Sequence, residues 1–186
     1  MPWNSGTFIS GVGDWFSTND AASEDATAEE IAKFYGRAAR TVIPSSPSWA
    51  STPITLKSDQ IIASGFSASF KLAKALSTGS YLTVNPSVWL PAATAIVTYW
   101  TGVTFLPMPP PPGGLVGATN VITFPGLPTP LNFDIGDAFK QEDAFKAARA
   151  LNDAMIRHLS SVTGLWTGTA PGAPPPPFAL PWVGLK

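Results

Sequence analysis

The chain has 186 residues, a formal net charge of −1, no cysteine, and only 12% charged residues. The near-zero net charge argues against nucleic acid as a main partner, because phosphate binding needs clustered Lys and Arg. The lack of cysteine excludes disulfides, thiolate metal sites and a cysteine nucleophile. Apolar residues make up 45%, which is enough for a folded core. The first residues lack the basic and apolar regions of a signal peptide, so we expect none.

Charged residues are unevenly distributed along the chain. No Asp, Glu, Lys, Arg or His occurs from Ala75 to Phe133, and none occurs from Leu159 to Leu185. The first of these runs contains large apolar side chains, among them Trp89 and Phe124. Surfaces exposed to water normally carry charge, and large exposed apolar patches commonly mark interaction sites. We therefore expect the first uncharged run to form a contact with another protein.

The predicted elements follow in chain order. Residues 1–22 are expected to form an irregular N-terminal arm, and residues 23–168 a single helical domain with a Pro/Gly-rich insertion at 105–133. Apolar residues at spacings of three and four predict helices from Thr27 to before Pro44, from Ser58 to between Leu76 and Gly79, from about Pro86 to Trp100, and from about Glu142 to Ser161. A short strand is predicted at 120–126.

Proline is concentrated in two similar places. Four consecutive prolines occur at 109–112 and again at 174–177, and each run follows a helix and a Trp-Thr-Gly sequence. Such runs favour the stiff polyproline II conformation, and their prolines have no N–H donors. We expect the second run to belong to an extended C-terminal arm at 169–186, which anchors the protein in a neighbouring molecule.

The residues that usually carry catalysis are sparse. His158 is the only histidine, and its place near the end of a helix favours a surface position or an interaction with the helix dipole. Adjacent acids such as Glu29 and Glu30 lie in the first turn of a predicted helix, which explains them without acid–base chemistry. No phosphate-binding loop and no nucleophile elbow is present. The sequence therefore predicts a non-enzymatic protein with no catalytic, cofactor-binding or metal residues.

Residues 86–168 resemble small structural proteins of large DNA viruses, particularly tailed phages. The resemblance rests on a helix ending "AIVTYWTGVTF", a Pro-Gly link "PMPPPPGGLVGATNVITFPG" and a helix ending "HLSSVTGLWTG". The resemblance is one of composition and order of elements and contains no diagnostic motif, so it implies no functional residue. It implies a virion protein assembled in the host cytoplasm, with copies of itself and other virion proteins as partners.

These observations predict a mainly α protein: a small bundle of about four helices with long Pro/Gly-rich connections, extended N- and C-terminal arms and little β structure. The expected function is that of a structural building block of a capsid, tail or baseplate. Two alternatives are a membrane-associated protein that uses the apolar 88–106 segment and an adaptor that displays polyproline. The predicted interface residues are Trp3, Trp15, Phe105, Leu106, Leu115, Val116, Phe178, Leu180 and Trp182.

Overall fold

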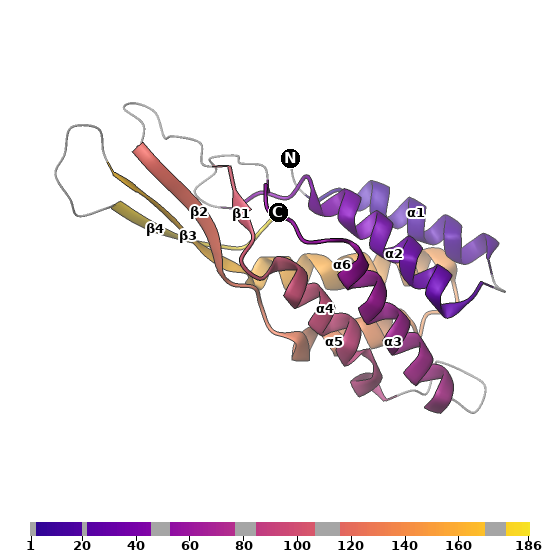
Figure 1. Cartoon of the computed structure of the whole chain (residues 1–186). Coiled ribbons are helices and arrows are strands. Elements are labelled where there is room, and N and C mark those ends of the chain that lie inside the picture. The colour runs from indigo at the N-terminus through magenta and orange to yellow at the C-terminus, as the bar shows by residue number, and fades with distance from the viewer. Residues whose placement is uncertain (1–2, 20–21, 46–52, 77–84, 107–115, 170–177) are drawn as a thin grey trace.

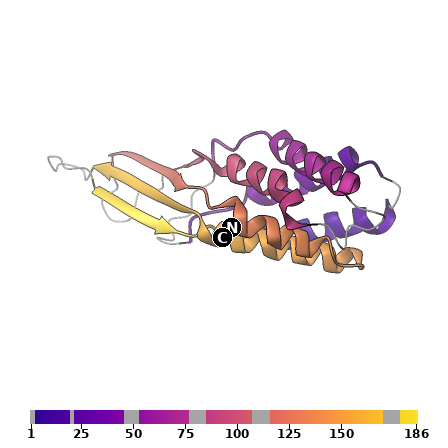
Figure 2. The same ribbon diagram turned by 90° about the horizontal axis from the view of Figure 1, so that it is seen from below.

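The computed structural model describes residues 3–19, 22–45, 53–76, 85–106, 116–169 and 178–186. These residues form six α-helices and one four-stranded antiparallel sheet, so the prediction of a mainly α protein is confirmed. Figures 1 and 2 show an elongated molecule with the helices at one end and the sheet projecting from the other. The two proline runs lie outside the described residues.

The four predicted helices are all present, with boundaries that differ from the expected ones by a few residues. The first is capped by Ser23, whose side chain accepts a hydrogen bond from the Ala26 amide, and not by Thr27. The third begins as a short 3₁₀ turn, η2. The observed elements are α2 (Glu24–Ala39), α3 (Gln60–Leu76), η2 (Pro86–Trp89) with α4 (Leu90–Trp100), and α6 (Ala144–Ser161).

The N-terminal arm is a helix, so the prediction of an irregular segment there is wrong. Helix α1 (Ser5–Thr18) packs against α2 and α6. Its glycines, which lower helix propensity, permit this packing. A Cβ on Gly11 would overlap the Phe34 ring, and a Cβ on Gly13 would lie 2.6 Å from the Phe145 ring.

A sixth helix, α5 (Pro128–Ala138), begins inside the predicted Pro/Gly-rich insertion and continues beyond its end. Pro128 and Pro130 both fall in its first turn, where the missing N–H is not needed for an intrahelical hydrogen bond. The helix buries Leu131 and Ile135 against the core. Prolines that suggested a loop therefore begin a helix.

The core joins helices from both ends of the chain. The indole Nε1 of Trp3 donates a hydrogen bond to the Asn152 Oδ1 over 2.8 Å, which connects the N-terminal segment to α6. The indole Nε1 of Trp100 donates to the Tyr35 hydroxyl over 2.6 Å, which connects α4 to α2. All four of these side chains are buried. Their polar atoms are thus paired inside an otherwise apolar interior.

The sheet has the strand order β1 (Thr104–Phe105), β2 (Val116–Phe124), β3 (Thr163–Thr169) and β4 (Phe178–Val183), and each strand runs antiparallel to its neighbours. Strand β2 includes most of the predicted strand. The extended C-terminal arm is a wrong prediction from residue 178 onward, because β4 pairs with β3. Pro181 is tolerated in β4 because this strand lies at the sheet edge.

The connection between α2 and α3 pairs with both edges of the sheet. Pro53 forms an antiparallel bridge with Phe105 of β1, and Pro44 forms one with Leu185, just beyond β4. Unpaired strand edges are templates for pairing with other chains, and natural proteins commonly cover them. At these points both edges of the sheet are occupied by the chain itself.

Candidate assembly surface

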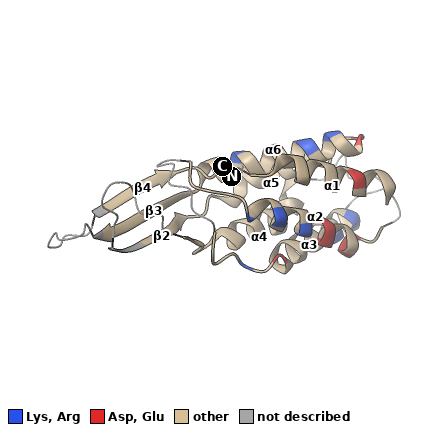
Figure 3. Cartoon of the chain, turned by 90° about the horizontal axis from the view of Figure 1, so that it is seen from above, with Lys and Arg blue, Asp and Glu red and all other residues tan. Residues whose placement is uncertain are grey.

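The two uncharged runs of the sequence come together in the sheet. Strands β1 and β2 belong to the 75–133 run, and β3 and β4 belong to the 159–185 run. The pairing of β2 with β3 joins them, with Asn120 opposite Trp166. Figure 3 shows the charged residues on the helices and their connections and none on the strands. The charge separation along the sequence is therefore also a separation in space.

One face of the sheet belongs to the protein's own core. Trp182 lies on this inner face, and its Nε1 donates a hydrogen bond to the Asn120 Oδ1 over 2.7 Å. Its ring meets Phe105 edge to face, with 5.8 Å between the ring centroids. Gly164 lies opposite Trp182, where a Cβ would overlap the indole. The buried side chains of the inner face are Phe105, Asn120, Ile122, Trp166 and Trp182.

The opposite face, which we call the outer sheet face, is partly open to solvent and carries no charge. Strand pairing aligns its residues in three rows that run across the strands. The longest row crosses all four strands and contains Thr104, Val121, Leu165 and Pro181. Val183 is 64% exposed, and the hydroxyls of Thr119 and Thr167 are hydrogen bonded over 2.6 Å. The face comprises Thr104, Thr119, Val121, Phe124, Thr163, Leu165, Thr167, Ala179, Pro181 and Val183.

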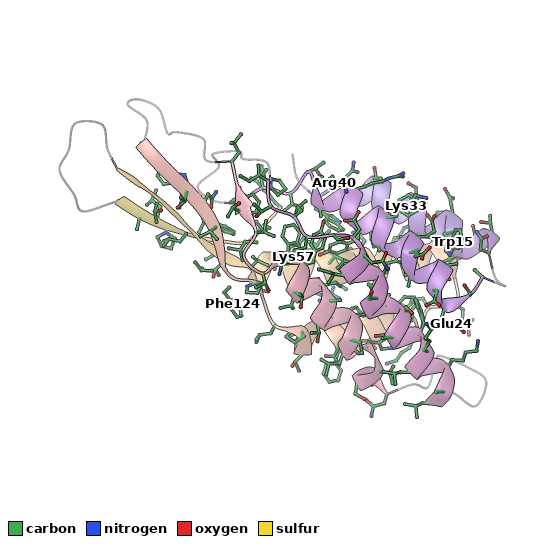
Figure 4. All side chains as sticks on the ribbon, in the orientation of Figure 1. Trp15, Glu24, Lys33, Arg40, Lys57 and Phe124 are labelled. Atoms are coloured by element: carbon green, nitrogen blue, oxygen red, sulfur yellow. The ribbon has the colours of Figure 1, made fainter. Side chains whose placement is uncertain are left out.

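A cleft of about 230 Å³ lies where the sheet meets α5 and α6. Two of its apolar side chains are strongly exposed, Phe124 at 40% and Leu127 at 58%. Figure 4 shows Phe124 pointing away from the body of the molecule near this junction. The cleft is lined by Phe124, Leu127, Pro130, Leu131, Asp134, Arg157, His158 and Ser161.

His158 is buried beside this cleft, which corrects the expected surface position. Its side chain is only 5% exposed, and the Nε2 atom has no hydrogen-bond partner among the described residues. Burial lowers the pKa of the imidazole to about 4, so the ring is neutral at pH 7. Gly126, at a φ of +88°, brings its backbone against the ring. Within the described chain, no carboxylate is hydrogen bonded to this histidine.

A second cavity, of about 310 Å³, lies at the far end of the helices and contains aromatic rings from Trp15, Phe16 and Phe139. Glu24 lines it but is hydrogen bonded to Lys74, and this bond lowers the pKa of the carboxyl. The Glu24 carboxyl is therefore ill suited to take up a proton near pH 7. In the described part of the chain, no group of three or more His, Asp or Glu side chains is arranged to hold a metal ion.

The predicted interface residues have different positions in the structure. Trp3, Phe105 and Trp182 are at most 6% exposed, which corrects their assignment to an exposed contact surface. Trp15 is half-buried with its Nε1 3.5 Å from the Thr27 hydroxyl, and Leu180 is half-buried against the core. Leu106 is 50% exposed at the end of β1. Leu115 lies outside the described residues, as do the side chains of Val116 and Phe178.

The predicted interface residues do not include two exposed residues, Val183 and Leu127, although Leu127 belongs to the uncharged run that was expected to form a contact. Val183 follows the buried Trp182 directly, so strand alternation places them on opposite faces, but this signal is usable only if β4 is first assigned as a strand. Leu127 directly precedes α5, the helix that its prolines concealed.

The apolar 88–106 segment is divided between η2, α4, a turn and β1. Among the helices of the described residues, none combines the length and apolar character needed to cross a bilayer. In comparisons with known proteins, no protein-family model, no curated protein and no solved structure matches this chain.

Proposed function

We propose that the protein is a non-enzymatic structural building block of a viral particle and associates through the outer sheet face. One observation carries the proposal: an exposed strand face without a single charge projects from a body that holds the charged residues. The centres of protein interfaces are depleted of charged residues, because burying an unpaired charge is costly. An uncharged face thus avoids a desolvation cost that an ordinary surface would incur.

The viral setting rests on the resemblance of residues 86–168 to small phage structural proteins. In this proposal the helices act as a compact bundle that holds the sheet outward, and the Pro/Gly-rich connections join its strands. The partners are other virion proteins and copies of the chain itself, and the protein resides in the virion after assembly in the host cytoplasm. Neither a cofactor nor nucleic acid takes part.

A lysine placed on the outer sheet face tests the proposal. Val183→Lys introduces a charge at a position that is 64% exposed, on an edge strand where lysine is well tolerated. The isolated variant should therefore melt like the parent protein. It should be incorporated poorly into particles, because the ammonium group would lose its hydration in the contact.

Leu76→Lys is the matched control. Leu76 is 68% exposed at the end of α3, so the same substitution is made at nearly equal exposure on the helical body. This variant should match the parent in both melting temperature and incorporation. If Val183→Lys is incorporated as well as Leu76→Lys, the outer sheet face is not the assembly surface.

A further inference from the structure

We propose that the cleft beside Phe124 is a self-association site, in which two copies of the chain meet across a twofold axis and Leu127 of each copy enters the cleft of the other. The inference deepens the proposed function by naming one partner of the uncharged surface, a second copy. It rests on the proposed function only in assuming that association takes place on the side of the molecule that carries the outer sheet face.

The size and lining of the cleft favour a side chain as its occupant. Its volume of about 230 Å³ lies below the roughly 300–1,000 Å³ of typical small-molecule sites. Phe124, Leu127, Pro130 and Leu131 line the cleft with apolar atoms, and Leu127 is also 58% exposed. The cleft of one copy can therefore bind the exposed Leu127 side chain of the other copy, and the reverse contact forms by symmetry.

The charges at the rim are self-complementary. The lining contains one acid and one base, Asp134 and Arg157, whose Oδ2 and Nε atoms lie 3.0 Å apart. A twofold axis places the same patch opposite itself, so a lone charge would face an identical charge. With one charge of each sign, Asp134 of either copy can face Arg157 of the other. The rim has no net charge, which disfavours a charged ligand.

The cleft is continuous with the outer sheet face. Phe124 pairs with Thr163, and Thr163 pairs with Val183, so one row leads from the cleft across the sheet. Pairing through the strand edges is blocked where Pro53 and Pro44 form their bridges. Two copies can therefore meet through this face.

Charge exchange between two variants tests this geometry directly. Asp134→Arg places only bases at the rim, and Arg157→Asp places only acids, so each variant should be monomeric where the parent is dimeric. An equimolar mixture should form heterodimers, because both intermolecular pairs are then opposite in sign. Native mass spectrometry distinguishes the heterodimer by mass, and sedimentation velocity measures the dimer fraction.

Two further variants make the result specific. Lys71→Asp disrupts an ion pair on α3 at 57% side-chain exposure, close to the 58% of Arg157, and should remain dimeric. Leu127→Ala should weaken the dimer by roughly tenfold or more if this side chain is the anchor. The far-UV circular dichroism of all variants should match that of the parent, because solvated ion pairs add little to the stability of one chain. A fall in melting temperature should not exceed the fall that dilution of the parent to its monomer produces.

A parent protein that stays monomeric, or a mixture that gives no heterodimer, overturns the self-association site. The proposed function fails separately, since it is tested by particle incorporation of Val183→Lys. Loss of incorporation in that variant, together with a monomeric parent, would leave the outer sheet face as a surface for other virion proteins and would reject the second copy as its partner.

Discussion

His158 links the protonation state of one residue to the stability of the fold. Its pKa falls from 6.5 to about 4 because burial disfavours the charged ring, and its Nε2 lacks a partner among the described residues. The unfolded chain therefore binds a proton at a higher pH than the folded chain. This difference has no effect well above pH 6.5, and it reduces stability increasingly as the pH falls from 6.5 to 4.

Acidification to pH 4 should therefore cost the folded state about 3 kcal/mol through this group alone. His158→Phe keeps a ring of similar size and removes the titration, so its stability should fall less between pH 7 and pH 4. Urea unfolding of both proteins at the two pH values gives the difference, in which the contribution of the carboxylates cancels. Equal losses in the two proteins would show that the histidine is already hydrated in the folded state.

Gly164 offers a second prediction at the scale of one residue. A methyl group at this position would overlap the Trp182 indole and lie 2.6 Å from the Val121 carbonyl oxygen. Gly164→Ala should destabilise the protein by about 1–3 kcal/mol and shift the tryptophan near-UV circular dichroism. Gly6→Ala is the control, because its new methyl would meet only the Asn4 Oδ1 at 3.7 Å. It should leave the near-UV signal unchanged and should not destabilise the protein.

At the scale of elements, the sequence predicts structure only where one local rule dominates. Apolar spacings of three and four identified four helices, because each buries one continuous stripe. Helix α1 was not predicted, because Gly11 and Gly13 allow close packing against rings that are distant in the sequence. Helix α5 was not predicted, because its first turn contains prolines. The uncharged character of the outer sheet face could be predicted from the sequence. Its exposed side could not, because this depends on strand register.

Strand β4 supplies a test of that register. Trp182 and Val183 are neighbours, but the first is 2% exposed and the second 64%. Trp182→Ala should lower the free energy of unfolding by about 3–5 kcal/mol, since it removes a buried indole and its hydrogen bond to Asn120. Val183→Ala should change it by less than about 0.5 kcal/mol. Chemical unfolding measures both changes in the free energy of unfolding. Similar changes at the two positions would mean that β4 does not pack as described.

At the scale of the whole molecule, the separation of charges predicts how assembly responds to salt. Salt screens contacts between charged groups, and the outer sheet face has none. If the protein assembles through this face, as proposed, its incorporation into particles should change little between about 0.05 and about 0.5 M NaCl, where the Debye length falls severalfold. Particle incorporation measured across this range provides the test, because the dimer proposed above includes charged contacts that salt would screen. A steep loss with added salt would instead assign the contact to the charged helices.

The packing of α1 on α6 has a consequence for how the chain folds during synthesis. The Trp3 indole finds its acceptor only at Asn152, and the backbone of Ile43 pairs with Lys186. Translation supplies roughly 5–20 residues per second, so the earliest segment waits for several seconds before its partners emerge. During this interval α2 can cover only part of α1, and the surface of α1 that packs on α6 remains exposed on the nascent chain. Such distant contacts slow folding and leave the unfinished chain prone to aggregate until its last residues are made.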